Sequence, residues 1–239
     1  MPDDRGVTRA EMFAELALAL HSATNLDETV EAVVQSALPM VGCDYAGVLL
    51  AGPAGPNGSP VIGAVTDARV ERLYRWQIES GTGPALDVLT GGRPVYVADV
   101  ALAAGRPHWR TEAVACGIGS VLHLPMLAGG HNLGVLSLYA VKPHAFSDID
   151  AEPIGRIVAR HATVAISSSR KEEDLLRAVD ARKLVGLAMG ILMERYGLDG
   201  DRAFEVLRRY SQETNTKLHT VAQRLVETRN LPSDHKLGD

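Results

Sequence analysis

The chain has 239 residues, of which 46% are hydrophobic and 22% are charged, and its formal net charge is −5. These values are ordinary for a soluble globular protein, and the length suits one large domain or two small ones. No apolar run approaches the roughly 20 residues that cross a bilayer, and no signal-peptide core follows the polar start Met1–Arg5, so we expect a cytoplasmic protein without membrane contact. The two cysteines, Cys43 and Cys116, make neither a disulfide framework nor a zinc site, and we expect buried, inert thiols.

Two helices are predicted within Thr8–Met40, because apolar residues recur there at helical spacing on both sides of a polar break. Thr8 followed by Glu11 is a capping-box pattern, which indicates a helix start. Pro39 and Gly42 are expected to end the second helix.

From Cys43 onward, short apolar runs are separated by Gly and Pro, which is typical of strands and turns. A turn-forming loop is expected at Gly52–Pro60 and a hairpin loop at Gly129–Asn132. Helices are expected at Asp67–Gln77, from the Gly81–Pro84 turn through Leu89, and up to Cys116. The predicted strands are Tyr45–Leu50, Val61–Thr66, Pro94–Val97, Ser120–Met126 and Leu133–Ala140. This order predicts an α+β fold, an antiparallel sheet with flanking helices.

A long helix is predicted to begin at Ile149 and to run into the C-terminal part of the chain. Two rows of positions seven residues apart predict a coiled-coil seam with a polar centre. The rows are Val158, Ala165, Glu172 and Val179, and Ile154, His161, Ser168 and Leu175. The alternative is one surface helix of the first domain followed by a flexible linker.

The C-terminal part is predicted to form three short helices in one all-α bundle. Gly197 is expected to stop the first helix, Asp199 or Asp201 to cap the second, and Asn215 with Thr216 to cap the third. The predicted core residues are Leu184, Ala188, Ile191, Leu192, Ala203, Phe204, Leu207, Tyr210, Leu218, Val221, Ala222, Leu225 and Val226. Gly186 and Gly190, one turn apart, indicate either a tight helix crossing or a face that a ligand approaches.

No catalytic motif is present in the sequence, so we expect no enzyme, no catalytic residue, no metal ion and no cofactor. His123 lies in a predicted strand between apolar neighbours and is expected to be a core or pocket histidine without bound haem. From Lys171 to Leu231, eleven basic residues face ten acidic ones, while Met1–Arg170 has twelve against seventeen. Any nucleic acid must therefore be held by a local face rather than by bulk charge.

The C-terminal part resembles the ANTAR domain, an RNA-binding three-helix module of bacterial antitermination regulators, from about Leu175 to Arg229. Met189 departs from the pattern, since many members carry Lys there. The resemblance rests on Ala188–Met193, Ala203-Phe204, Leu207-Arg208, Ser211-Gln212, Asn215–Leu218 and Val221-Ala222. It implies an output that binds paired RNA hairpins in nascent transcripts and prevents termination, and two hairpins suit a homodimer.

Cationic and hydrogen-bonding side chains of this part can contact phosphates and base edges. The expected RNA-binding residues are Arg182, Lys183, Arg195, Arg208, Arg209, Ser211, Asn215, Lys217 and Arg224.

The preceding region, roughly Glu11 to Ser167, resembles a GAF domain. The resemblance rests on Gly81–Val95, Ser120–Leu122, Leu124-Pro125, Leu133–Tyr139 and Phe146–Asp148. It implies a sensory domain that takes a small-molecule effector, in a pocket that we expect to include Tyr45, Ala85, Leu86, His123 and Leu136. Relatives often have Cys where Ala85 stands, so a thiol-based role is not expected there.

The predicted organisation is a GAF sensory domain at residues 8–167, a signalling helix at 149–180, an ANTAR domain at 175–230 and a flexible tail at 231–239. One alternative is a DNA-binding regulator with a small-molecule sensor, because three small helices can hold a helix-turn-helix. Another is a small-molecule or redox enzyme built on the GAF domain alone. A methionine-sulfoxide reductase of that kind needs several pocket cysteines, which two cysteines fit poorly.

Overall fold

The structure is a computed structural model that describes residues 4–52, 58–147 and 150–230, with side chains from residue 10 onward. It divides into two compact units, Met1–Arg170 and Lys171–Asp239. No helix in these ranges is both long and apolar enough to cross a membrane. The predicted tail at 231–239, residues 53–57 of the predicted loop, Asp148 and the predicted helix start at Ile149 lie outside the described residues.

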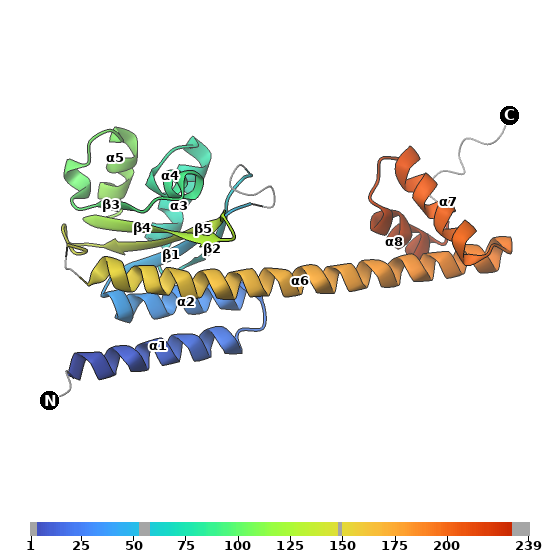
Figure 1. Cartoon of the computed structure of the whole chain (residues 1–239). Coiled ribbons are helices and arrows are strands. Elements are labelled where there is room, and N and C mark those ends of the chain that lie inside the picture. The colour runs from blue at the N-terminus through green and yellow to red at the C-terminus, as the bar shows by residue number, and fades with distance from the viewer. Residues whose placement is uncertain (1–3, 53–57, 148–149, 231–239) are drawn as a thin grey trace. The chain divides into compact units, whose positions relative to one another are not determined.

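The first unit is built on a five-stranded sheet in which every neighbouring pair of strands is antiparallel (Figure 1). The strand order is β2-β1-β5-β4-β3. The strands are β1 Tyr45–Leu50, β2 Val61–Val65, β3 Val95–Val97, β4 Ser120–Ala128 and β5 His131–Ala140. The predicted α+β fold and its five strands are confirmed.

The hairpin between β4 and β5 is tighter than the sequence predicted. Its turn is only Gly129 and Gly130, whose φ values are +56° and +82°. Two consecutive left-handed residues form the two-residue turn that suits twisted hairpins, and glycine adopts it without strain. His131 and Asn132 therefore belong to β5 instead of the loop.

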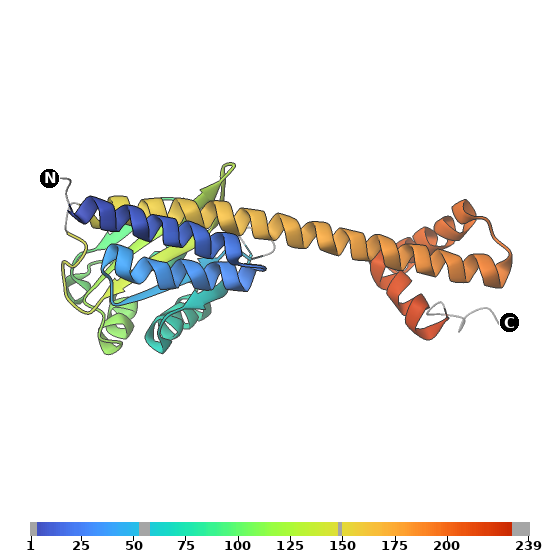
Figure 2. The same cartoon turned by 90° about the horizontal axis from the view of Figure 1, so that it is seen from below.

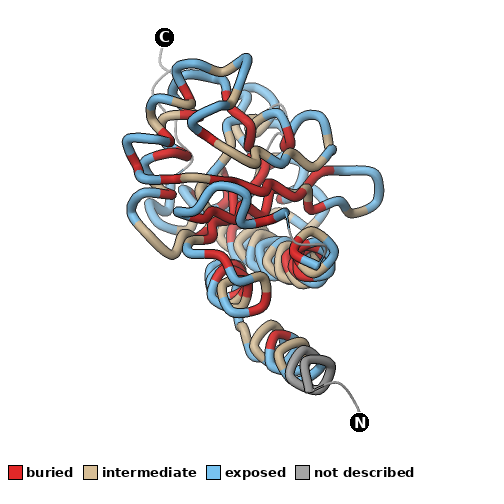
Figure 3. Tube along the Cα trace, turned by 90° about the vertical axis from the view of Figure 1, so that its left-hand side faces the viewer, coloured by how far each residue is buried: buried red, intermediate tan, exposed pale blue. Residues whose placement is uncertain are grey.

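Helices cover both faces of this sheet (Figures 1 and 3). The helices of the first unit are α1 Asp4–Ser22, α2 Leu26–Val41, α3 Ala68–Ser80, α4 Pro84–Gly91, the short 3₁₀ helix Val100–Leu102, α5 Pro107–Ala115 and the first part of α6 Ala151–Tyr196. Helices α2 and α6 cover one face, and α3, α4 and α5 cover the other. Seen from below, α1 lies along α2 and α6 (Figure 2).

Two separate hydrophobic cores result from this layering. Because successive residues of a strand point to opposite faces, Leu136 and Leu138 join the core under α2 and α6. Val135 and Tyr139 join the core under α3–α5, together with the buried Trp109 of α5. The core under α3–α5 is the one that positions the candidate sensor residues described below.

Two predicted helix signals in this unit are wrong. Helix α1 begins at Asp4, so Thr8 lies inside it and does not cap it. Pro39 lies inside α2, which continues to Val41 and ends at Gly42 with φ +74°. Pro39 removes one helical hydrogen bond, but it does not end the helix, which stops three residues later at Gly42.

The second unit is a three-helix bundle made of the C-terminal part of α6, α7 Gly200–Glu213 and α8 Leu218–Thr228. Its first helix is not short, because α6 is continuous over 46 residues. Gly197 follows α6 with φ +62°, and Asp199 caps α7 by accepting a hydrogen bond from the Arg202 N–H at 2.8 Å. The buried residues are Ala188, Leu192, Ala203, Leu207, Val221, Ala222 and Leu225, as predicted.

In the first unit, one position of the predicted coiled-coil seam, Val158, is wrong, whereas His161, Ala165 and Ser168 line the same groove as Ile157 and Val164. Val158 is fully buried in the core under α2 and α6, so it is not on an outer face. The residues one position earlier, Ile157 and Val164, are exposed. In the second unit, Leu175 and Val179 are exposed as the seam requires.

Candidate nucleic-acid interface

The predicted RNA-binding cations are all exposed, but they differ in what they contact. Arg195 donates from Nη1 to the backbone carbonyl of Arg229 at 2.5 Å and to Oδ1 of Asn230 at 3.4 Å. Since Arg229 follows the last residue of α8, this guanidinium ties the end of α6 to the end of α8. Its role in the bundle is structural.

The two arginines of α7 pair with carboxylates of their own helix. Arg209 Nε donates to Glu213 Oε1 at 2.7 Å, and this bond raises the pKa of the guanidinium further above its usual range. Arg208 lies 4.0 Å from Glu205. Exposed pairs of this kind contribute little to stability, but each places a negative charge beside the cation and weakens its pull on phosphate.

Ser211 and Asn215 shape the turn between α7 and α8. The Ser211 hydroxyl donates to the Thr216 carbonyl at 2.6 Å. Asn215 has φ +49°, a left-handed conformation that asparagine tolerates better than most residues. The residue that caps α8 is Lys217, without any side-chain hydrogen bond, so the prediction that Asn215 and Thr216 cap it is wrong.

The other four predicted cations make no ion pair with any carboxylate in the described ranges. Arg182 and Lys183 are on α6, Lys217 precedes α8, and Arg224 is on α8. We call these four the unpaired cations. No neighbouring carboxylate within ion-pair distance weakens their attraction for phosphate.

Two of the unpaired cations line separate hollows of the surface. Arg182 lines an apolar groove together with Leu218 and His219, which directly follow Lys217. Arg224 lines a small depression with Tyr210 and Thr216 at the α7–α8 junction. The sequence reasoning missed His219 and the exposure of Phe204, which was predicted to pack in the core but is 38% exposed beside the groove.

In the first unit, His123 is fully buried in the core under α3–α5. Its Nδ1 lies 2.7 Å from the Ser137 hydroxyl, and its ring meets Tyr139 edge-on at 5.6 Å between centroids. Burial lowers the pKa of His123 to about 3, so the imidazole is neutral at physiological pH. A neutral imidazole has one donor nitrogen and one acceptor nitrogen.

Four buried polar atoms of this unit lack a hydrogen bond of normal geometry to the described residues: Tyr74 Oη, Trp109 Nε1, His123 Nε2 and Tyr139 Oη. The two tyrosine hydroxyls interact with each other and with Ser137. The four side chains all belong to the core under α3–α5, or pack into it beside Tyr139. Burial raises the pKa of both tyrosines well above the usual range, so they are neutral donors. Unpaired buried polar atoms are rare in folded proteins, and four in one core indicate a polar interior.

Glycine at position 47 makes room for this group. A Cβ there would lie 2.7 Å from Val70 and 2.8 Å from the Tyr74 ring. The sequence reasoning found His123 but missed Tyr74, Trp109 and Tyr139, which lie on three different elements and share no spacing.

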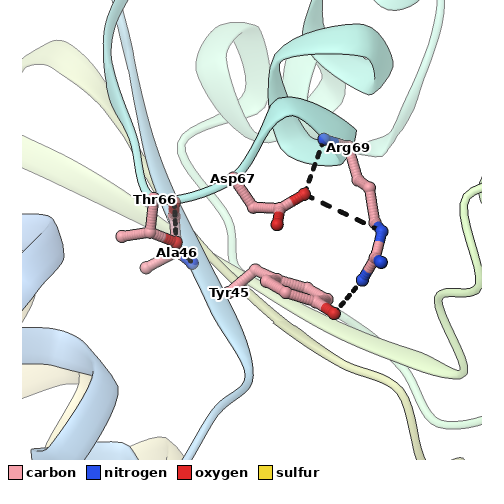
Figure 4. A network of polar contacts seen from close by, with 5 residues as sticks. All are labelled: Tyr45, Ala46, Thr66, Asp67 and Arg69. Carbon is pink, nitrogen blue, oxygen red and sulfur yellow. Dashed lines mark hydrogen bonds and ion pairs between the residues drawn. The ribbon is translucent and has the colours of Figure 1, made fainter.

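The predicted pocket residues do not converge on one site. Tyr45 is at the start of β1, where its hydroxyl accepts a hydrogen bond from Arg69 and its ring lies 5.0 Å under that guanidinium (Figure 4). The Ala85 N–H donates to Gln77 Oε1 at 3.0 Å, and Leu86 is partly buried beside it. Leu136 points to the opposite face of the sheet, so its place in a pocket with His123 is wrong.

The two thiols are buried, as predicted. Burial raises the pKa of Cys43 to about 12 and also raises the pKa of Cys116. Within the described ranges, no group of three or more His, Cys, Asp or Glu side chains is placed to hold a metal ion.

Comparison with known proteins assigns both units. The GAF domain family matches residues 23–167, and the ANTAR domain family matches residues 173–226. No curated protein sequence matches the chain.

Several solved structures are similar to the first unit. The GAF domain of a phosphoenolpyruvate-protein phosphotransferase from Coxiella burnetii is 18% identical with a TM-score of 0.54, over 70% of this chain and 96% of that one. The corresponding Acinetobacter GAF domain is 14% identical with a TM-score of 0.52, over 69% and 95%. Free methionine-R-sulfoxide reductase from Neisseria meningitidis is 15% identical with a TM-score of 0.52, over 72% and 96%.

At these identities the structural likeness shows the fold alone. The family matches cover more: the GAF match spans over half of the chain, and the ANTAR match follows it directly. GAF domains sense signals, and ANTAR domains are RNA-binding modules of antitermination regulators. The chain therefore belongs to the GAF domain family, and its GAF domain is followed by an ANTAR domain, the architecture of a signal-sensing regulator.

Proposed function

We propose that this regulator binds paired hairpins in nascent RNA through its ANTAR unit and thereby prevents transcription termination. The observation that carries the proposal is the set of unpaired cations, Arg182, Lys183, Lys217 and Arg224, on a unit whose eleven basic and ten acidic residues nearly cancel. Four cations without carboxylate partners give a local attraction for phosphate that the net charge does not. Arg182 and Lys183 come from α6, Lys217 from the residue before α8 and Arg224 from α8.

The same observation argues against α7 as a DNA-recognition helix. A helix that enters the major groove needs cations along its exposed face. On α7, the exposed Arg208 and Arg209 each stand beside a carboxylate, Glu205 and Glu213 respectively. The unpaired cations lie elsewhere, so α7 is a poor recognition helix.

The sensor part of the proposal rests on the polar interior of the GAF unit. Tyr74, Trp109 and Tyr139 each have a buried polar atom without a well-formed hydrogen bond to the protein, and the neutral His123 has another. These groups suit a small, uncharged, hydrogen-bonding effector, because a charged one would lose its hydration without a compensating charge. We infer a sensor without catalysis, since a redox role needs an accessible thiol of low pKa and Cys43 is buried with a raised pKa.

We further propose that the protein acts as a homodimer, so that two ANTAR units meet two hairpins. An apolar groove of about 690 Å³ runs between α1 and α6 of the first unit and is lined by Leu20, Ile157 and Val164 among others. Val164 is 72% exposed and Leu18 of α1 is 66% exposed. A second copy that packs its own α1 and α6 here would bury Val164.

The proposed RNA function is tested by sequencing RNA that is crosslinked to the full-length protein in cells. We expect reads concentrated in transcript leaders that can fold into two adjacent hairpins. Lys217→Glu should deplete these reads, while Lys142→Glu, an exposed lysine of the GAF unit, should not. Reads spread evenly over the transcriptome, or unaffected by Lys217→Glu, would contradict the proposal.

A further inference from the structure

Two of the eight histidines of the chain line one groove of the GAF unit. The groove has a volume of about 690 Å³ and lies between α1 and α6, the helices seen from below in Figure 2. His21 stands in the last turn of α1 and His161 in α6. The rings of His161 and Phe13, a residue of α1, are 6.1 Å apart between centroids, so this imidazole faces the opposite wall of the groove. Both histidines are exposed in the single chain and can exchange protons with the solvent.

The groove has positive charge, but no carboxylate is among the described residues that line it. Its other lining residues are apolar apart from Arg160 and Ser168. The remaining charged groups of the surrounding helices do not line it, and they include Glu11 and Glu15 of α1, Asp27, Glu28 and Glu31 of α2, and Glu152, Arg156, Lys171 and Glu172 of α6. A proton that either histidine takes up is therefore placed among apolar side chains and beside a cation, without a counter-charge in the groove.

The face of α6 that lines the groove continues along the helix at heptad spacing. His161 and Ser168 of the groove are followed one heptad later by Leu175, and Ala165 is followed two heptads later by Val179. Leu175 and Val179 are exposed. A helix face with this repeat packs against a helix that has the same repeat, so the partner that fits it is a second copy of this chain.

A dimer through this groove covers both histidines of each copy. The contact then holds four histidines and two Arg160 side chains, because each copy contributes two and one. Burial disfavours the charged form of histidine, and like charges in one contact repel each other. The neutral imidazole packs there without this cost. Histidine is also the side chain that ordinarily changes its charge between pH 5 and pH 8.

We propose that this groove is a pH switch of dimerisation, in which protonation of His21 and His161 separates the two copies. The dimer binds fewer protons than two separate chains, so it is favoured at higher pH and is lost as the pH falls. This inference rests on the proposed homodimer and adds its regulation. Since two hairpins call for two ANTAR units, acidification weakens binding of the paired hairpins without any effector in the GAF unit.

The experiment measures the dimer dissociation constant of the full-length protein by sedimentation at constant ionic strength, from about pH 8 to about pH 5.5. The variants are His21→Gln, His161→Gln and the double variant, which keep a polar side chain that does not titrate. His131→Gln changes an exposed histidine outside the groove and is the matched control. His161→Lys places a permanent positive charge in the groove. Circular dichroism at each pH establishes that the protein is folded.

Each histidine that must lose its proton on dimerisation can weaken the dimer by up to about tenfold per pH unit. We expect the wild-type dissociation constant to rise about a hundredfold over this range. Each single glutamine variant should show a smaller rise, and the double variant should stay dimeric throughout. His131→Gln should behave like the wild type. His161→Lys should be monomeric even at about pH 8.

The inference is overturned if the wild-type dimer is as tight at acidic pH as at alkaline pH, or if the double variant dissociates as the wild type does. It is also overturned if His161→Lys remains dimeric, because the groove would then tolerate the charge. A wild-type protein that is monomeric at every pH would instead refute the proposed homodimer, so the two failures are distinguishable.

Discussion

The hydroxyl of Ser211 donates a hydrogen bond to the carbonyl of Thr216 at 2.6 Å and thereby closes the turn between α7 and α8. The ANTAR resemblance had placed Ser211 among the RNA-contacting residues. In the folded unit its donor proton is used by the protein itself. Ser211 therefore holds the turn that precedes Lys217 and α8.

Ser211→Ala is predicted to lower the free energy of unfolding of the ANTAR unit by about 1 kcal/mol, because a partly buried carbonyl loses its hydrogen bond. Urea unfolding of the full-length protein, followed by hydrogen exchange in α7 and α8, measures the change. Gln212→Ala, at the exposed neighbouring position, is the control and should change nothing. A large loss of RNA affinity in Ser211→Ala with unchanged stability would show that the hydroxyl contacts RNA after all.

Because His123 is buried as a neutral group, we expect the free energy of unfolding of the GAF unit to depend on pH. Its pKa is about 3 in the folded unit and about 6.5 in an unfolded chain, so the unfolded state binds the proton more readily between these values. The stabilisation is fully present above pH 6.5 and is lost as the pH falls toward 3, by about 1.4 kcal/mol per pH unit.

The test compares unfolding free energies between pH 6 and pH 4 for the wild type, His123→Gln and His131→Gln. Carboxylates titrate equally in all three, so the difference isolates the histidine. The slope of His123→Gln should be shallower, and that of His131→Gln, which changes an exposed residue, should match the wild type. Equal slopes in all three would mean that His123 is not buried as a neutral group.

Val164→Glu is predicted to convert the proposed dimer into a monomer, since it places a charge on the apolar groove between α1 and α6. Sedimentation velocity at tens of micromolar gives the oligomeric state. Val114→Glu changes a similarly exposed apolar residue on α5 and should remain dimeric. A wild-type protein that sediments only as a monomer would exclude this interface.

The two cysteines should react with a thiol reagent only as fast as the GAF unit opens. Both are buried, and burial raises both pKa values, so the reactive thiolate is scarce and shielded. Absorbance assays on native and denatured protein, with Cys43→Ala and Cys116→Ala to separate the sites, measure each rate. Rapid labelling of either thiol in native protein would reopen a redox role.

The strands were predictable because their apolar runs are short and bounded by Gly and Pro. The errors arose where two patterns overlap. On α6, both Ile157 and Val158 belong to apolar rows, and only the packing of the sheet decides that Val158 turns inward. Thr8 matches a cap in isolation, but the helix extends past it to Asp4.

The sequence indicated which residue types the candidate sites contain, but it did not indicate which partners these residues contact in the folded chain. The charge of these arginines does not show that Arg195 donates a hydrogen bond to the Arg229 carbonyl, or that Arg209 forms an ion pair with Glu213. The polar interior of the GAF unit was missed for another reason. Tyr74, Trp109 and Tyr139 read as ordinary core residues, and only three-dimensional packing leaves their polar atoms without well-formed hydrogen bonds.

The central claim, recognition of paired RNA hairpins through the unpaired cations, is tested most directly by one titration series at several salt concentrations. The ligands are a two-hairpin RNA, a single hairpin and a duplex DNA with the same number of phosphates. We predict tightest binding to the two-hairpin RNA, with a shallow salt dependence of about two to four phosphates per protomer. Lys217→Ala should cost about 1–2 kcal/mol of binding free energy, as expected for one charge-assisted contact. Equal or tighter binding of duplex DNA, or wild-type affinity in Lys217→Ala with folding intact, would contradict the account.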